Sequence, residues 1–151
     1  MSLRARLVVR LALVLGALPV VAHAADVSDA WARSTVKGQT ASVVYLTITS
    51  ATPARLVGAS SPAAAVVQVH EMSMQGTTMK MRPLETLELP AGQAVELKAG
   101  GAHVMLMDLR QQLSSGDKLP LILRIEGADH KVVEQALAVE IRDAPPMMKS
   151  R

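Results

Sequence analysis

The chain has 151 residues, with 16 Lys and Arg, 13 Asp and Glu, no Cys and a formal net charge of +3. Three arginines lie before residue 11 and no acidic residue precedes Asp26, so residues 25–151 carry 13 basic and 13 acidic residues. This balance argues against nucleic acids and anionic membranes as partners, because both require a concentrated excess of Lys and Arg. The lack of Cys excludes disulfides and metal sites built on thiolates.

The first 24 residues have the pattern of a secretory signal peptide. The early arginines precede an apolar run at 11–21, which is too short to span a bilayer comfortably, and Ala-His-Ala follows at 22–24. We therefore expect cleavage after Ala24, with the position after Ala25 as the second choice, and export to the periplasm. An uncleaved N-terminal anchor is the alternative.

The rest of the chain shows the alternation of half-buried strands, most clearly at 43–48, where β-branched residues are frequent. Turn sequences rich in Gly, Pro, Ser or Asp separate the segments that share this character. We expect strands at 43–48, 55–59, 65–72, 79–82, 87–89, 95–97, 102–109, 119–126 and 132–141.

Closely spaced short strands predict an all-β fold, namely an antiparallel Greek-key β-sandwich or barrel. We expect one domain at 25–143, followed by a flexible tail at 144–151. Neither a sustained helical period nor a Gly-x-Gly-x-x-Gly pattern supports a nucleotide-binding α/β fold. Phe is absent, and Trp31 and Tyr45 are the only aromatic residues, so the core must use Val, Leu, Ile and Ala, with Met as a further candidate.

Methionine and histidine are clustered in one part of the chain. Residues two apart in a strand project from the same face, so each cluster presents its sulfur and nitrogen atoms on one side. The three groups are His70 with Met72 and Met74, Met79 with Met81, and His103 with Met105 and Met107.

These side chains have the chemistry of a site for a soft metal ion. Thioether sulfur is soft and imidazole is borderline, so together, without carboxylate or thiolate, they suit Cu(I) better than Zn(II), Mg(II) or Ca(II). The residues alone leave a second interpretation open, in which the methionines fill the core and the histidines are structural. Acidic residues and serines form no catalytic spacing, and His130 lies in a turn-like sequence, so we assign it no role.

Four of these residues follow the pattern His-x(10)-Met-x(21)-His-x-Met, namely His70, Met81, His103 and Met105. In this spacing the chain resembles the periplasmic PCuAC family of copper chaperones, whose fold is similar to that of cupredoxins. The residues around these positions, and Ala-Trp-Ala-Arg at 30–33, are also similar to that family. The resemblance therefore covers nearly the whole expected domain.

The resemblance implies a shallow, partly exposed Cu(I) site, with Cu(II) bound at most transiently, whose ligands are His70, Met81, His103 and Met105. Its neighbours would be Met72, Met74, Met79 and Met107. It also implies a chaperone, not an enzyme, that supplies copper to the CuA subunit of cytochrome c oxidase or works with a Sco-type chaperone. We further expect a monomer.

Other functions share parts of this pattern. An electron-transfer cupredoxin requires a Cys thiolate, which the chain lacks. A copper-buffering or tolerance protein would use the same site, and the sequence does not separate buffering from delivery. An interaction domain without metal predicts that substitution of His103 and Met105 leaves metal binding unchanged, because there would be none to lose.

Overall fold

A computed structural model describes residues 24–144, and its regular elements are β-strands. They are β1 (Asp26–Arg33), β2 (Ala41–Thr49), β3 (Ala54–Ser60), β4 (Ala64–Gln75), β5 (Thr78–Leu84), β6 (Leu87–Leu89), β7 (Ala94–Leu97), β8 (His103–Leu109), β9 (Lys118–Gly127) and β10 (Val132–Arg142). Across residues 24–144 there is no helix of the length and apolar character needed to cross a membrane. Apart from Ala24 and Ala144, the expected signal peptide and tail lie outside the described residues. Each strand expected from the alternation is present, with ends shifted by three residues at most.

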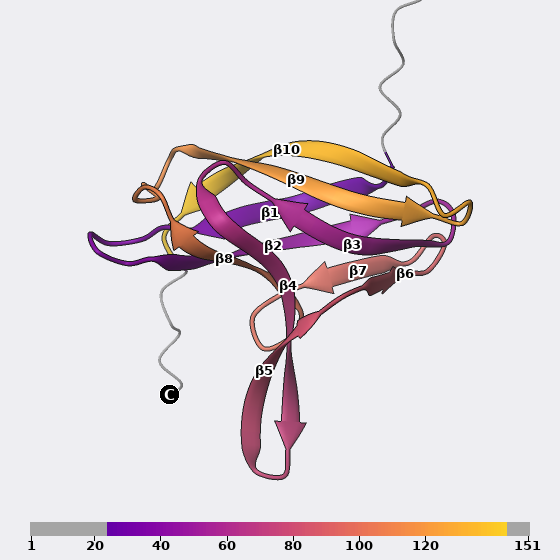
Figure 1. The fold of residues 1–151 in the computed structure, drawn as a ribbon, viewed down its shortest axis with the longest axis horizontal. Coiled ribbons are helices and arrows are strands. Elements are labelled where there is room, and N and C mark those ends of the chain that lie inside the picture. Colours follow the sequence, from indigo (N-terminus) through magenta and orange to yellow (C-terminus); the bar gives the residue numbers. More distant parts are fainter. Residues whose placement is uncertain (1–23, 145–151) are drawn as a thin grey trace, which may run out of the picture.

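The strands form one hydrogen-bonded sheet in the order β5-β4-β8-β2-β1-β10-β9-β3-β6, and β7 also pairs with β2. The sheet bends over on itself, so that β9 and β10 lie across from β2 and β8 as a second layer (Figure 1). The path ends at β5 and β6, so the strands of residues 24–144 form an open sandwich and not a closed barrel.

The prediction of an all-β sandwich is confirmed, but the prediction that it is antiparallel is wrong for one pair of strands. β1 and β10 run parallel, with Trp31 opposite Glu140. These strands lie at opposite ends of the domain sequence, and alternation within a strand carries no information on which distant strand it joins. The mixed character of the sheet therefore arises from tertiary structure.

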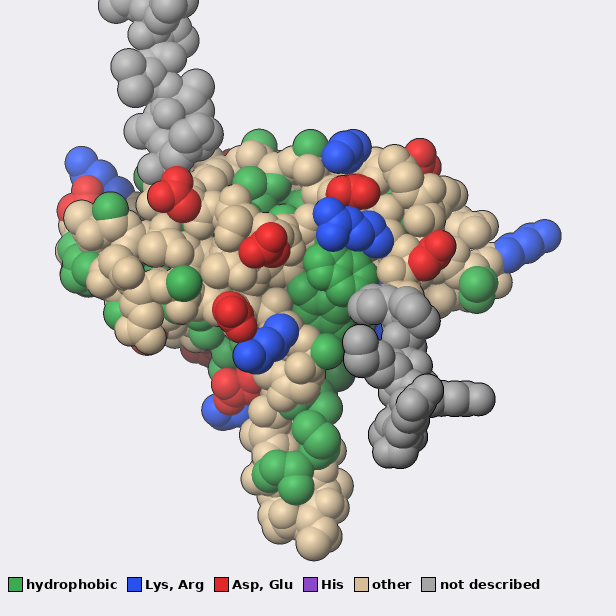
Figure 2. All heavy atoms as spheres, turned by 180° about the vertical axis from the view of Figure 1, so that it is seen from behind, with side chains coloured by type: hydrophobic (Ala, Val, Ile, Leu, Met, Phe, Trp, Pro, Cys, Tyr) green, Lys and Arg blue, Asp and Glu red, His purple; other side chains and the backbone are tan. Residues whose placement is uncertain are grey.

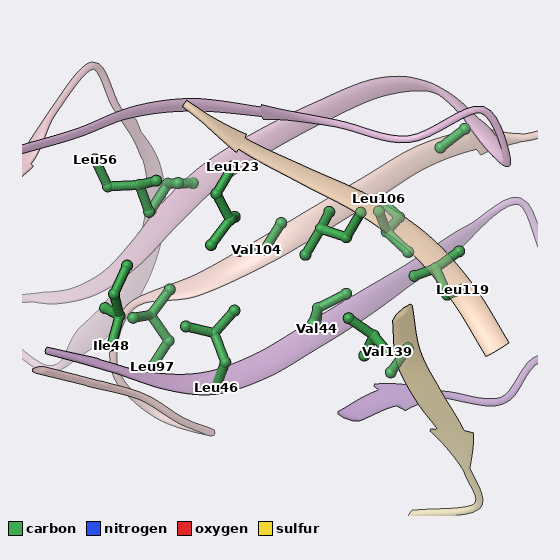
Figure 3. Close-up of a cluster of buried hydrophobic side chains, with 14 of the residues drawn as sticks. Val44, Leu46, Ile48, Leu56, Leu97, Val104, Leu106, Leu119, Leu123 and Val139 are labelled. Atoms are coloured by element: carbon green, nitrogen blue, oxygen red, sulfur yellow. The ribbon is translucent and has the colours of Figure 1, made fainter. Parts of the chain in front are cut away.

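The core lies between the two layers and consists of Val, Leu, Ile and Ala side chains. Val44 and Leu46 of β2 and Val104 and Leu106 of β8 are almost fully buried and face the residues of β9 and β10 (Figure 3). None of the methionines within residues 24–144 belongs to this core. The core therefore consists of the aliphatic residues that the sequence predicted. Methionine, which was a further candidate for the core, is not among them.

β1 is the strand that the alternation does not predict. Its register against β2 shifts between Ser28 and Trp31, and Asp29 has a φ of 51°, so an irregularity interrupts the two-residue period. The start of the strand is held by the buried side chain of Gln135 in β10. Gln135 Oε1 accepts a hydrogen bond from the backbone N–H of Ala25 at 3.1 Å, and Nε2 donates to the Ala25 carbonyl at 2.8 Å.

β4 and β5 extend beyond the sandwich as a two-stranded projection, which we call the arm and define as residues 71–82 (Figure 1). Figure 2 shows hydrophobic side chains along this projection. One face is polar, where the Arg82 guanidinium donates to Glu71, with its Nε at 2.7 Å from Oε1. The other, which we call the thioether face, carries Met72, Met74, Met79 and Met81.

Candidate metal site

Three neighbouring strands, β5, β4 and β8, bring the clustered histidines and methionines onto one surface. His70 of β4 lies directly opposite His103 of β8, and Gln68 lies opposite Met105. On the other side of β4, Met72 lies opposite Met81 of β5, which is therefore diagonal to His70. The segments at 70, 81 and 103–105, far apart in the sequence, thus meet on adjacent strands.

The register also places these side chains on the same face. Directly opposed residues share a face, and so do residues two apart in a strand, which groups all the histidines and methionines of the three strands. The intervening residues of β8, Val104 and Leu106, face the core and are fully buried. The alternation of β8 therefore separates packing on one side from sulfur and nitrogen chemistry on the other.

The imidazole of His103 is buried, with 5% of its surface exposed. Its Nδ1 lies 3.1 Å from the Gly101 carbonyl oxygen, which only accepts hydrogen bonds, so Nδ1 carries the proton. Nε2 then has a free lone pair. That atom is shielded from solvent and has no hydrogen-bond partner among residues 24–144.

His70 has the same arrangement with its two ring nitrogens exchanged. Nε2 lies 3.1 Å from Gln68 Oε1 and donates to it, which leaves the lone pair on Nδ1. Nδ1 is also shielded, and residues 24–144 offer it no hydrogen-bond partner. Partial burial, and then the charge that His103 would carry, lower the pKa of His70 from its ordinary value of 6.5, so the ring is neutral at neutral pH.

The two rings lie close together, with centroids 6.1 Å apart and planes inclined by 61°. A buried nitrogen without a partner is unfavourable, and here two such atoms occur on facing strands. Gln68 and Gly101 hold the opposite ring nitrogens, as groups around metal-binding histidines commonly do. The sequence analysis did not identify these two supporting groups. Each lies two residues before its histidine and therefore on the same side of the chain, and this spacing could have indicated them.

The methionines differ in their distance from the histidine pair, His70 and His103. Met72 and Met105 are the nearest by register, each two residues along its strand from a histidine of the pair, and Met81 lies opposite Met72, one strand further out, with 48% of its surface exposed. Met107 lies opposite Val66, two positions further along β8 than Met105. It is therefore further from the histidine pair than a neighbour of the copper ligands, as predicted from the sequence, would be. Met72, Met74, Met79 and Met81 all belong to the arm.

Residues 24–144 offer no comparable arrangement of ligands for a hard metal ion. Within residues 24–144, no three His, Asp or Glu side chains are grouped in a way that could hold a metal ion. His130 lies in the β9–β10 turn, where its side chain is 81% exposed and contacts Glu126 at 2.9 Å.

Comparison with known sequences gives two matches over most of this domain. Residues 25–137 match the model of the LpqE-like family, which is described as a family of candidate lipoproteins. The protein Lxx21020 of Leifsonia xyli subsp. xyli (strain CTCB07), also named as a candidate lipoprotein, is 32% identical over 123 residues, which span 81% of this chain and 72% of that protein.

Comparison with solved structures gives matches to PCuAC domains. The copper-bound PCuAC domain from PmoF2 has a TM-score of 0.66 and 22% identity, with 81% of this chain and 95% of that domain covered. The Cu(I) form of DR1885 from Deinococcus radiodurans has a TM-score of 0.53 and 28% identity, with 76% and 75% covered. The cupredoxin-like fold expected from the sequence is confirmed by these likenesses.

Proposed function

Because the chain belongs to the LpqE-like family and, as its sequence predicted, to the PCuAC family, we propose that it is an exported copper chaperone. It binds Cu(I) as cargo through His70, Met81, His103 and Met105. The observation that carries this proposal is the histidine pair, whose two free lone pairs are buried on facing strands beside thioethers. Neutral imidazole and thioether ligands favour a soft monovalent ion, so the bound state is Cu(I), and Cu(II) is held at most transiently.

The unequal exposure of the ligands supports a role in transfer. His103 is buried and fixed by Gly101, whereas Met81 projects from the arm with nearly half of its surface exposed. An acceptor ligand therefore displaces Met81 first and the histidines last, so the ion passes between proteins without release into solvent. Each exchange forms one bond to copper and breaks another, and no substrate bond is changed, so the protein is not an enzyme.

The resemblance to PCuAC chaperones supports a more specific assignment. The acceptor is the CuA subunit of cytochrome c oxidase, reached directly or through a Sco-type chaperone, and the protein acts as a monomer in the periplasm. The relatives' names describe lipoproteins. This chain has no Cys to which a thiol-linked lipid could be attached, so export rests on the predicted signal peptide at 1–24.

Metal binding is tested by anaerobic Cu(I) titration against a chromophoric chelator, combined with X-ray absorption. We expect both nitrogen and sulfur neighbours, and a loss of affinity of at least about tenfold in His103→Gln, since even groups that only support metal ligands contribute this much. His130→Gln is the matched control, because His130 is exposed in a different turn. Equal affinities of the two variants would contradict the proposed site.

Delivery is tested with the soluble CuA domain of an oxidase as apo acceptor. The Cu(I)-loaded protein is mixed with the acceptor in the presence of excess chelator. If the protein delivers copper, acceptor loading exceeds the level that the chelator allows for free ions. Loading limited to that level would instead favour copper buffering, the second function consistent with this site.

A further inference from the structure

The thioether face of the arm carries more sulfur than the proposed site uses. Met81 is the only arm residue in the proposed ligand set, yet Met72, Met74 and Met79 lie on the same face. Met74 and Met79 are 61% and 52% exposed, and neither is among the core residues or the partly buried side chains packed against the core. Their presence therefore requires a reason other than packing.

The register arranges these residues as successive cross-strand pairs. Met72 lies opposite Met81, and Met74 lies opposite Met79 nearer the tip. Opposed residues in antiparallel strands have Cβ atoms about 5 Å apart, which lets two flexible methionine side chains place their sulfurs on one ion. Successive pairs on one face are about 7 Å apart along the strands. The sulfur atoms thus continue outward from the histidine pair.

The stability of the arm does not account for methionine at these positions. A two-stranded hairpin outside a sandwich is marginally stable, and β-branched or aromatic residues would support it better than methionine. Its opposite face is polar, with Glu71 and Arg82 paired, as expected for a projection surrounded by water. Exposed apolar side chains on the other face reduce solubility unless they bind something. A soft ion is the ligand that four thioethers recognise by their chemistry.

We propose that Met74 and Met79, with Met72 beside them, form a second and weaker Cu(I) site near the tip of the arm. The ion moves between this site and the histidine pair through the Met72 and Met81 pair. This inference rests on the proposed function. In each step one Cu–S bond forms while another breaks, the ion remains Cu(I), and no electron or proton is transferred. The tip site extends the reach of the chaperone toward its source or acceptor.

The test is an anaerobic Cu(I) titration of the exported chain with methyl-13C-labelled methionine, followed by NMR. We expect two equivalents to bind. The first shifts the Met81 and Met105 methyl signals, and the second shifts those of Met74 and Met79. The double variant Met74→Leu/Met79→Leu retains the first equivalent and loses the second. Met107→Leu, on the same face but on β8 and away from the arm, is the matched control and retains both.

The outcomes separate this inference from the proposed function. If no equivalent binds, the copper-chaperone proposal itself fails. If one equivalent binds and the Met74 and Met79 signals of the unmodified protein do not move at any ratio, only the tip site is refuted. Retention of two equivalents by the double variant refutes it as well. The NMR measurement needs no substitution, so the result does not depend on the folding of the variants.

Discussion

Leu106→Ala and Met105→Leu alter neighbouring residues of β8 whose side chains face opposite sides of the strand. Leu106 faces the core and is fully buried, whereas Met105 is partly exposed on the face of the histidine pair. We expect the first substitution to reduce stability without removing a metal ligand. We expect the second to reduce copper affinity and to change stability little.

The expected magnitudes follow from burial. Truncation of a fully buried leucine removes its transfer free energy and leaves a cavity, at a cost of about 3 kcal/mol. For a domain of this size, about 4 °C of melting temperature is lost per kcal/mol, so the midpoint should fall by about 12 °C. Met105→Leu conserves volume and should cost less than about 1 kcal/mol. Loss of its thioether should lower the Cu(I) affinity about tenfold or more.

Both quantities are measurable on the same samples. Trp31 is the only tryptophan and lies 5.2 Å from the ring of Tyr45, so its fluorescence reports unfolding in urea without other tryptophan signals. Competition with a Cu(I) chelator reports affinity. If Met105→Leu lowered the unfolding midpoint as far as Leu106→Ala, Met105 would contribute to the core and the assignment of faces along β8 would be refuted.

Three further predictions concern pH and the frame that supports the site. The pKa of His70 is lowered, so the folded protein binds fewer protons than the unfolded chain, and its stability should decrease as pH falls below the ordinary value of 6.5. Protonation of His70 should lower the Cu(I) affinity only below that value, and a His70→Gln variant should lose the stability effect. Gln135→Ala should cost about 1–3 kcal/mol in urea unfolding, because it leaves the buried main-chain nitrogen and carbonyl oxygen of Ala25 without their partner, and an unchanged midpoint would contradict this role. Gly116→Ala should cost about 1 kcal/mol or more, since Gly116 has a φ of +93°, and a neutral effect on thermal unfolding would argue against that backbone conformation.

The sequence by itself determined the local structure and the chemistry of the candidate ligands. The period of two in segments such as 43–48 and 119–126 is a local property of each strand, because burial of one face requires it, and both segments are strands in the structure. The same period placed His103 and Met105 on the same side of their strand. Residue types alone predict a soft metal ion in preference to a hard one.

Tertiary structure decided which strands meet and which face is covered. The irregularity in β1 hid that strand from the alternation, and its parallel pairing with β10 joins residues about a hundred positions apart. The sequence also did not determine whether the methionines are buried or exposed. A residue such as Met74 has the same local sequence pattern in a core strand and in an exposed arm. Burial depends on what packs against a face, and the orientation of the His70 and His103 lone pairs depends on neighbours that only the assembled sheet supplies.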